Sequence, residues 1–173
     1  MGDRKYLPIY LNDHLAAAVG AVQLARRAAG SNRDSPYGAP LARLAEEIDQ
    51  DRRALQDLLK RLGIRGDPIK ILATVGAERL GRFKLNGELL RYSPLSRLEE
   101  LELLAVGVTG KLALWRALRA NLAADPRVDG VDFDRLVDRA TSQRRSIDRL
   151  RERAAAEALG GKADSTDRTS TGD

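Results

Sequence analysis

Cysteine is absent from this chain of 173 residues, and aromatic residues make up only 4% of it. The missing cysteines exclude disulfides, thiolate metal sites and thiol nucleophiles, and their absence is typical of a reducing compartment. The low aromatic content argues against a stacking surface for single-stranded nucleic acid. Histidine occurs once, at His14, so any site that needs several imidazole groups is also excluded.

Long apolar runs are missing as well. The longest, residues 103–108, is far shorter than the roughly 18 residues that a membrane-spanning helix needs. The first 14 residues are too short and too often interrupted by polar groups for a secretory signal. We therefore expect a soluble protein without a membrane span, located in the cytoplasm.

Basic residues are abundant, and the formal net charge is +5. A basic chain is a candidate for nucleic-acid binding. However, 24 of the 30 basic residues are arginine, in a chain also rich in alanine and leucine, which is the composition that a GC-rich genome produces. The 25 acidic residues are interspersed among the basic ones. We therefore do not expect nucleic acid as a partner.

Apolar residues recur at steps of three and four along most of the chain, which predicts helices, and strand patterns are nearly absent. Long helices are predicted over about 8–29, 40–62, 93–123 and 131–159, with a shorter one over about 68–85. Gly63 is the predicted C-terminal cap of the second helix. Gly107 and Gly110 are expected to allow close helix approach, because a helix interior otherwise disfavours glycine.

These elements predict an all-α protein with one domain over residues 6–159, a size that suits a single core. Two pairs of long helices with short turns, joined by a long crossover, form an antiparallel four-helix bundle. The crossover carries the short extra helix. Residues 160–173 are rich in serine, threonine, aspartate and glycine, and we expect them to be a disordered tail.

Two stretches of the predicted second and fourth helices match each other. Residues 51–58 (DRRALQDL) align with residues 143–150 (QRRSIDRL) at a constant offset of 92. Two interpretations are open. Arginine-rich amphipathic helices can resemble one another by chance, or the first helix pair is repeated as the second.

The apolar stripe of each long helix is interrupted by polar residues that fall on the same face. These residues are His14, Asp51, Arg52, Glu102, Gln143 and Arg144. Buried charges need partners, so we expect Arg52 and Arg144 to face Asp51 and Glu102 in a structural layer that fixes the register of the helices. The alternatives are that these side chains reach water at the stripe edges, or that they hold a metal ion.

A metal site can be tested against what metals require. A di-iron carboxylate bundle takes two Glu-x-x-His pairs, which a chain with one histidine cannot provide. Counted from the turns, Glu102 and Gln143 differ in depth by about nine residues, or roughly 13 Å along a helix. Glu99 has a separate explanation, because Ser96 and Glu99 form a capping-box pattern. We therefore expect no full di-iron centre.

Three stretches resemble the ferritin-like superfamily: 10–14 (YLNDH), 44–55 (LAEEIDQDRRAL) and 98–111 (LEELELLAVGVTGK). Within this superfamily the chain resembles bacterial ferritin-like proteins of uncharacterised role, over about residues 6–158. The resemblance implies a ferritin-like bundle, with carboxylates at positions like Glu47, Glu99 and Glu102 serving as ligands in metal-binding relatives. Gln50 and Ser142 stand where further ligands are expected. This departure implies a member that kept the bundle and lost the metal.

Neither a phosphate-binding glycine loop nor a catalytic triad can be recognised. The leading hypothesis is a non-catalytic bundle without a cofactor that acts through a protein partner or self-association. One alternative is a bundle that binds a single iron or other divalent ion through His14, Glu47, Asp51 and Glu102. The other is a binder of nucleic acid or an anionic surface through arginines of the fourth helix. These arginines are Arg139, Arg144, Arg145, Arg149 and Arg153.

Overall fold

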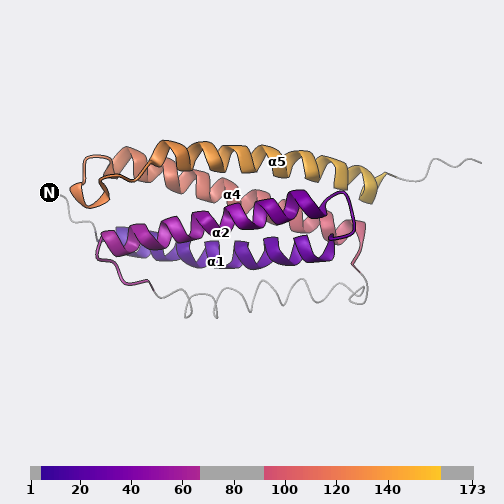
Figure 1. The fold of residues 1–173 in the computed structure, drawn as a ribbon, viewed down its shortest axis with the longest axis horizontal. Helices are drawn as coiled ribbons and strands as arrows, with labels where there is room; N and C mark the ends of the chain where they lie inside the picture. Colours follow the sequence, from indigo (N-terminus) through magenta and orange to yellow (C-terminus); the bar gives the residue numbers. More distant parts are fainter. Residues whose placement is uncertain (1–4, 67–91, 161–173) are drawn as a thin grey trace, which may run out of the picture.

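The computed structural model describes residues 5–66 and 92–160, which form four long α-helices and one short 3-10 helix (Figure 1). The elements are α1 (Leu7–Ser31), α2 (Gly38–Arg61), α4 (Pro94–Leu122), η1 (Pro126–Val128) and α5 (Phe133–Leu159). The all-α prediction is confirmed for these residues, and the ends of the four long helices differ from the predicted ones by at most two residues. The short helix predicted over 68–85 and the tail beyond residue 160 lie outside the described residues.

Glycines determine both ends of α2. A side chain at Gly38 could not fit, because its Cβ would lie 2.7 Å from the carbonyl oxygens of Asn32 and Arg33. Gly63 has a φ of +71°, a conformation that glycine adopts without steric cost. The next amide, that of Ile64, donates to the carbonyl of Leu59 at 2.9 Å and satisfies the helix end. The predicted cap at Gly63 is therefore confirmed.

Polar side chains cap the starts of α4 and α5. The hydroxyl of Ser93 accepts a hydrogen bond from the Ser96 amide at 3.1 Å, and Asp132 caps α5 through the Arg135 amide at 2.9 Å. Because α4 begins directly after Ser93, Ser96 lies in the first turn and not at the N-cap. The expected capping box of Ser96 and Glu99 is therefore wrong.

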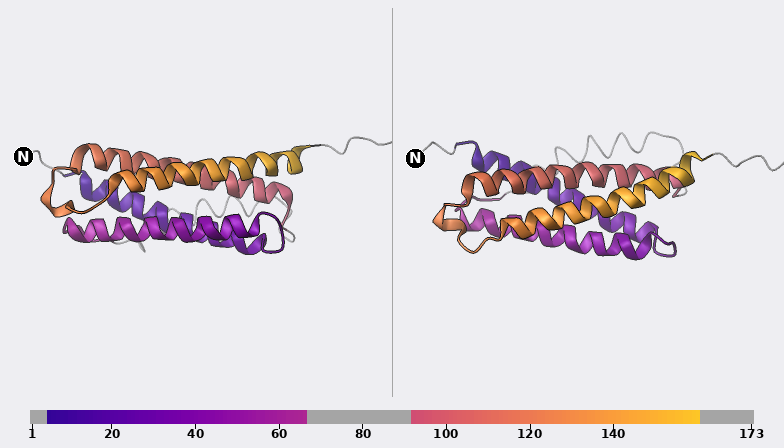
Figure 2. Two further views of the ribbon diagram at one scale, coloured as in Figure 1. Left: turned by 45° about the horizontal axis from the view of Figure 1, so that its top comes forward. Right: turned by 90° about the horizontal axis from the view of Figure 1, so that it is seen from above.

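The helices pack as two antiparallel pairs, α1 with α2 and α4 with α5, and α1 also packs on α4. In Figures 1 and 2, α1 and α5 run in one direction along the bundle, and α2 and α4 run in the other. The end of α2 and the start of α4 therefore lie at opposite ends of the bundle. No helix in the described part of the chain is both long and apolar enough to cross a membrane.

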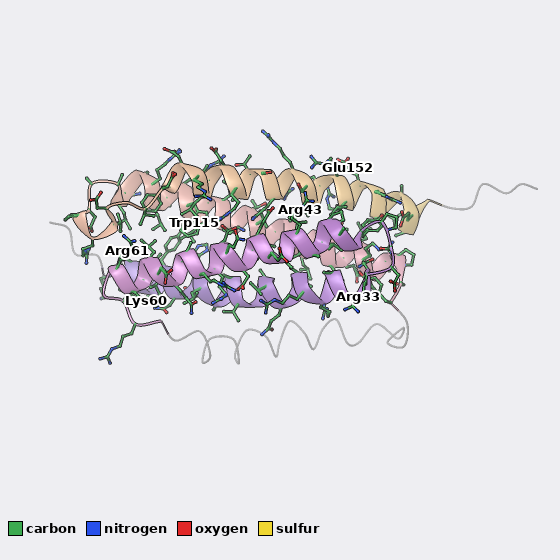
Figure 3. All side chains as sticks on the ribbon, in the orientation of Figure 1. Arg33, Arg43, Lys60, Arg61, Trp115 and Glu152 are labelled. Carbon is green, nitrogen blue, oxygen red and sulfur yellow. The ribbon has the colours of Figure 1, made fainter. Side chains whose placement is uncertain are left out.

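The core consists of two apolar clusters, one toward each end of the bundle. Trp115 is the largest fully buried side chain and belongs to the first cluster, together with Leu11, Leu55 and Phe133. Figure 3 places it inside the bundle, whereas Lys60 and Glu152 lie on the outside. The second cluster surrounds Ile48, Leu101 and Ile147. Each fully buried leucine or isoleucine stabilises the fold by about 1.5–3 kcal/mol.

The glycines of α4 do not mediate close packing. A Cβ at Gly107 would lie 4.0 Å from the Cβ of Ala21, which is ordinary contact, and a Cβ at Gly110 would meet nothing within 4 Å. The expectation that these two glycines allow close helix approach is therefore wrong. Gly110 instead marks an open part of the surface of α4.

Candidate functional site

A polar layer lies between the two apolar clusters, in the middle of the bundle. Asp51 of α2, Lys111 of α4 and Arg139 and Gln143 of α5 form it. The Asp51 side chain is 1% exposed and that of Lys111 is 13% exposed. Asp51 points inward because it shares the buried face of α2 with Ile48 and Leu55. The layer therefore lies at the interface between the α1–α2 pair and the α4–α5 pair, and helices of both pairs enclose it.

The Asp51 carboxylate accepts hydrogen bonds from three residues of the other helix pair. The Lys111 ammonium donates to its Oδ2 at 2.5 Å and to Gln143 Oε1, also at 2.5 Å. Gln143 Nε2 donates to the same Oδ2 at 3.0 Å, and Arg139 Nε donates to Oδ1 at 2.7 Å. The guanidinium of Arg139 also forms an ion pair with Oδ1. One carboxylate thus joins α2 to both α4 and α5.

Burial and neighbouring charges act in opposite directions on Lys111. Burial lowers the pKa of its ammonium, the Asp51 carboxylate raises it, and Arg139 lowers it further. Glu47, one turn before Asp51, also raises this pKa. Two basic groups therefore lie near two acids. Such a buried arrangement is tolerated only when each charge keeps its partner, because an unpaired buried charge is strongly destabilising.

Of the residues expected in this layer, the structure brings Asp51 and Gln143 together. These are the residues that the two matching stretches align. Glu102 is exposed on the surface of α4, so the expectation that it faces the interior is wrong. Lys111 occupies the interior position instead. α1 contributes only small or aliphatic side chains between its two buried parts, at residues 17–21.

Arg52 and Arg144 do not pair with Asp51 or Glu102 as expected. Arg52 bonds to Asp49 at 2.7 Å and to Gln56 at 2.5 Å, both on its own helix. Arg144 forms an ion pair with Asp148 on α5 and donates to Thr109 Oγ1 of α4 at 2.9 Å. Both arginines are half-buried, so their long side chains follow the bundle surface instead of entering the layer.

The candidate metal ligands are spread over the bundle. His14 is half-buried on α1, its ring 4.6 Å from that of Tyr10, and burial lowers its pKa. Glu47 and Glu99 are half-buried on different helices, and Glu102 is exposed. Within residues 5–66 and 92–160, no three acidic or histidine side chains lie close enough together to hold a metal ion. With a lysine ammonium bound to Asp51, these residues do not fit an iron or other divalent ion.

A second polar cluster lies at the end of the bundle where α4 begins. The Arg97 guanidinium lies 4.3 Å from the centre of the Tyr37 ring and donates from Nε to Asn32 Oδ1 at 2.6 Å. Its Nη1 donates to Glu157 of α5 at 2.7 Å. Arg97 thereby connects the α1–α2 loop to the start of α4 and the end of α5. Sequence reasoning missed this cluster.

Tyr92 extends this cluster toward a buried acid. Its hydroxyl donates to Glu100 Oε2 at 3.0 Å and accepts from Asn32 Nδ2 at 2.6 Å. Burial, together with Glu100, raises the pKa of Tyr92 to about 12. Arg27 of α1 bonds to the other oxygen of Glu100 at 2.9 Å. These contacts join α1 and the start of α4 at this end of the bundle.

The arginines proposed for anion binding do not form one free surface. Arg139 bonds to Asp51, Arg144 to Asp148, and Arg153 to Glu157. Arg145 and Arg149 are exposed. Between α2 and α5, a shallow groove of about 590 Å³ is lined by both signs of charge, including Arg43, Glu46, Arg135 and Asp138. This groove therefore does not carry charge of one sign.

Comparison with known proteins gave no match: no family model matches the sequence, and neither a curated protein nor a solved structure matches it. The chemistry of the polar layer is therefore the main guide to function. Its groups are satisfied by one another, and none is left as a free acid, base or nucleophile facing an open cavity.

Proposed function

We propose that this chain is a non-catalytic bundle of the ferritin-like type that acts through protein contacts on its outer surface. The observation that carries this proposal is Lys111 at the centre of the bundle. Metal-binding members of this class place carboxylates and histidines in the bundle core. Here the core carboxylate, Asp51, bonds to a lysine ammonium and an arginine.

A metal ion would have to displace those cations and would find too few ligands. Divalent iron and zinc take at least three protein ligands in the sites of enzymes and storage proteins. Asp51 has its lone pairs occupied by three donors, and Glu102 faces away from the layer. The one carboxylate of the layer is thus already paired with two cations, Lys111 and Arg139, which supports a structural role.

The outer surface offers the apolar groups that protein contacts use. Several large apolar side chains are exposed although most of the chain is charged or buried. They include Tyr6, Ile9, Leu95, Leu103, Val106 and Leu159, and Val106 is 70% exposed. Single exposed apolar residues are ordinary, but neighbouring ones on a helix face are typical of interaction sites. Leu103 and Val106 are such neighbours on α4.

The interior part of the proposal is tested by elemental analysis of the untagged, purified protein. We expect iron and zinc far below one equivalent, before and after incubation with either metal. As a control, the Asp51→Asn variant should give the same metal content as the unaltered chain. One equivalent of metal that is lost in this variant would contradict the proposal and support the metal-binding alternative.

The surface part is tested by placing a photo-crosslinking amino acid at Val106 or Ile9 in living cells that produce the full chain. We expect covalent adducts with protein from at least one of these positions. The same group at Arg145, an exposed position on α5, is the matched control and should give few adducts. If neither apolar position yields an adduct above this control, the proposal of function through protein contacts is wrong.

A further inference from the structure

The outward face of α4 is apolar in its middle part. Val106 is 70% exposed and Leu103 is 39% exposed. Gly110 and Ala113 continue the face as small residues, and a Cβ at Gly110 would meet nothing within 4 Å. The inward face of the same helix is filled by buried residues such as Leu104 and Val108. Nothing in the described part of the chain covers the outward face at Val106.

Charges of opposite sign lie on either side of this apolar part. Glu102 precedes it and Arg116 follows it, and both are exposed. Arg119 lies about 140° around the helix from Val106 and forms an ion pair with Asp134 of α5, so it is not part of this face. Glu102 and Arg116 are equally far from Thr109 in the sequence. A helix that pairs with an identical antiparallel helix centred near Thr109 would therefore place Glu102 of each copy opposite Arg116 of the other.

We propose that a second copy of this chain docks on this face, with the two α4 helices antiparallel about a two-fold axis between Thr109 and Gly110. The inference rests on the proposed function, because it names the partner of the same surface. A symmetric dimer requires a surface that is complementary to itself. The α4 face meets this condition twice: Glu102 of each copy lies opposite Arg116 of the other, and the protruding Val106 of one copy lies opposite Ala113 and the uncovered Gly110 of the other.

The oligomeric state of the full chain is the first test. Light scattering coupled to size-exclusion chromatography should give a dimer at a protein concentration on the order of 100 µM. Val106→Glu should give a monomer with unchanged helix content, because Val106 is largely exposed and its replacement leaves the core intact. Arg145→Glu, on the outer face of α5, is the matched control and should remain a dimer.

Charge exchange tests the antiparallel register. Glu102→Arg or Arg116→Glu alone would place like charges opposite each other, and we expect either change to weaken the dimer on the order of tenfold at low salt. The double variant restores opposite charges with reversed signs, so its dissociation constant should return close to that of the unaltered chain. A double variant as weak as the two single changes combined would overturn the proposed register.

Disulfide trapping gives an independent measure of register, because the chain has no cysteine of its own. Gly110→Cys lies next to the proposed axis and should cross-link two copies on mild oxidation. Val106→Cys should not cross-link with itself, since its two copies would lie roughly 10 Å apart along the helices. Mixing Val106→Cys with Ala113→Cys chains should give the heterodimer.

The outcomes separate this inference from the proposed function. A monomer at every concentration, with no cross-link at Gly110→Cys, overturns the dimer. If Val106 nevertheless yields photo-adducts with a different protein, the contact function stands and only the second copy is wrong. If Val106 and Ile9 yield no adduct at all, both proposals fail.

Discussion

Asp49 and Asp51 lie two positions apart on α2, and each accepts hydrogen bonds from three residues. Asp49 bonds to Arg26 of α1 and to Arg52 and Arg53 of its own helix. The partners of Asp51 are Lys111, Arg139 and Gln143, all on α4 and α5. Two such neighbours point in different directions because consecutive helix positions turn by about 100°.

The surroundings of the two carboxylates differ more than their bonding. The side chains of Arg26 and Arg53 are 65% and 67% exposed, so water screens their pairing with Asp49. The partners of Asp51 are mostly buried, and they belong to the opposite helix pair. Asp49 therefore stabilises α2 and its contact with α1, whereas Asp51 determines how the two pairs fit together.

The largest expected loss of stability comes from removing the Asp51 carboxylate. Asp51→Ala leaves the Lys111 ammonium buried without its counter-charge, so we expect the free energy of unfolding to fall by about 3–5 kcal/mol. Asp49→Ala is the matched control and should cost about 1 kcal/mol. Urea unfolding at pH 7 measures both. Equal losses would show that the burial difference has no energetic consequence.

Replacing the inner layer as a whole should cost much less than breaking it. The triple variant Asp51→Leu, Lys111→Met and Gln143→Leu leaves no unpaired charge from these three positions, and Arg139 can turn toward the groove between α2 and α5. We expect its free energy of unfolding to lie within about 2 kcal/mol of that of the unaltered chain. A triple variant as unstable as Asp51→Ala would contradict this account of the layer.

Acid should remove the contribution that the Asp49 carboxylate makes to the free energy of unfolding. Burial alone would raise the pKa of Asp49, but the hydrogen bonds from Arg52 and Arg53 outweigh burial and lower it below its ordinary value of 3.8. The unfolded chain therefore binds a proton more readily, and the stabilisation present above pH 3.8 is lost as the pH falls through the lowered pKa. The stability difference between the unaltered chain and Asp49→Asn should shrink in this range, as measured by urea unfolding between pH 6 and about pH 2.5.

The smallest effect is expected at a pair that lies entirely on the surface. Lys60 and Asp57 are 3.1 Å apart, with side chains 76% and 65% exposed. Lys60→Ala should change the free energy of unfolding by less than about 0.5 kcal/mol, because exposed pairs gain little in water. A loss of stability comparable to that of Asp49→Ala would mean that the exposed fraction of the paired side chains does not determine the size of the effects at Asp51, Asp49 and Lys60.

The helices and half of the polar layer could be predicted from the sequence. The apolar periodicity defined the four long helices, and the angular position of Asp51 and Gln143 on their helices placed both inside. The nine-residue difference in depth between Glu102 and Gln143 also indicates which residue of α4 lies in the layer. Lys111 lies nine residues after Glu102, at the depth of Gln143. Single-helix patterns gave no reason to prefer it, because α4 is apolar nearly all round before that point.

The remaining contacts depend on which helix ends meet. Arg97 reaches Tyr37, Asn32 and Glu157 only because three chain segments converge at one end of the bundle. Arg139 has the sequence pattern of a surface arginine, yet its length lets the guanidinium reach an inner carboxylate. Both cases require the pairing of helices, which periodicity along a single helix does not contain.

Asp51 and Gln143 occupy equivalent positions of the two matching stretches, and they contact each other. Two hairpins packed about a two-fold axis bring equivalent positions together at that axis. If the layer followed this symmetry fully, two carboxylates would face each other. Here the position equivalent to Asp51 holds the amide Gln143. Lys111 has no charged equivalent either, because the residue 92 positions before it is Val19. Two α1–α2 hairpins from different chains would bring their Asp51 carboxylates together without a lysine. The unequal charges of the halves therefore favour pairing within one chain over exchange of hairpins between chains.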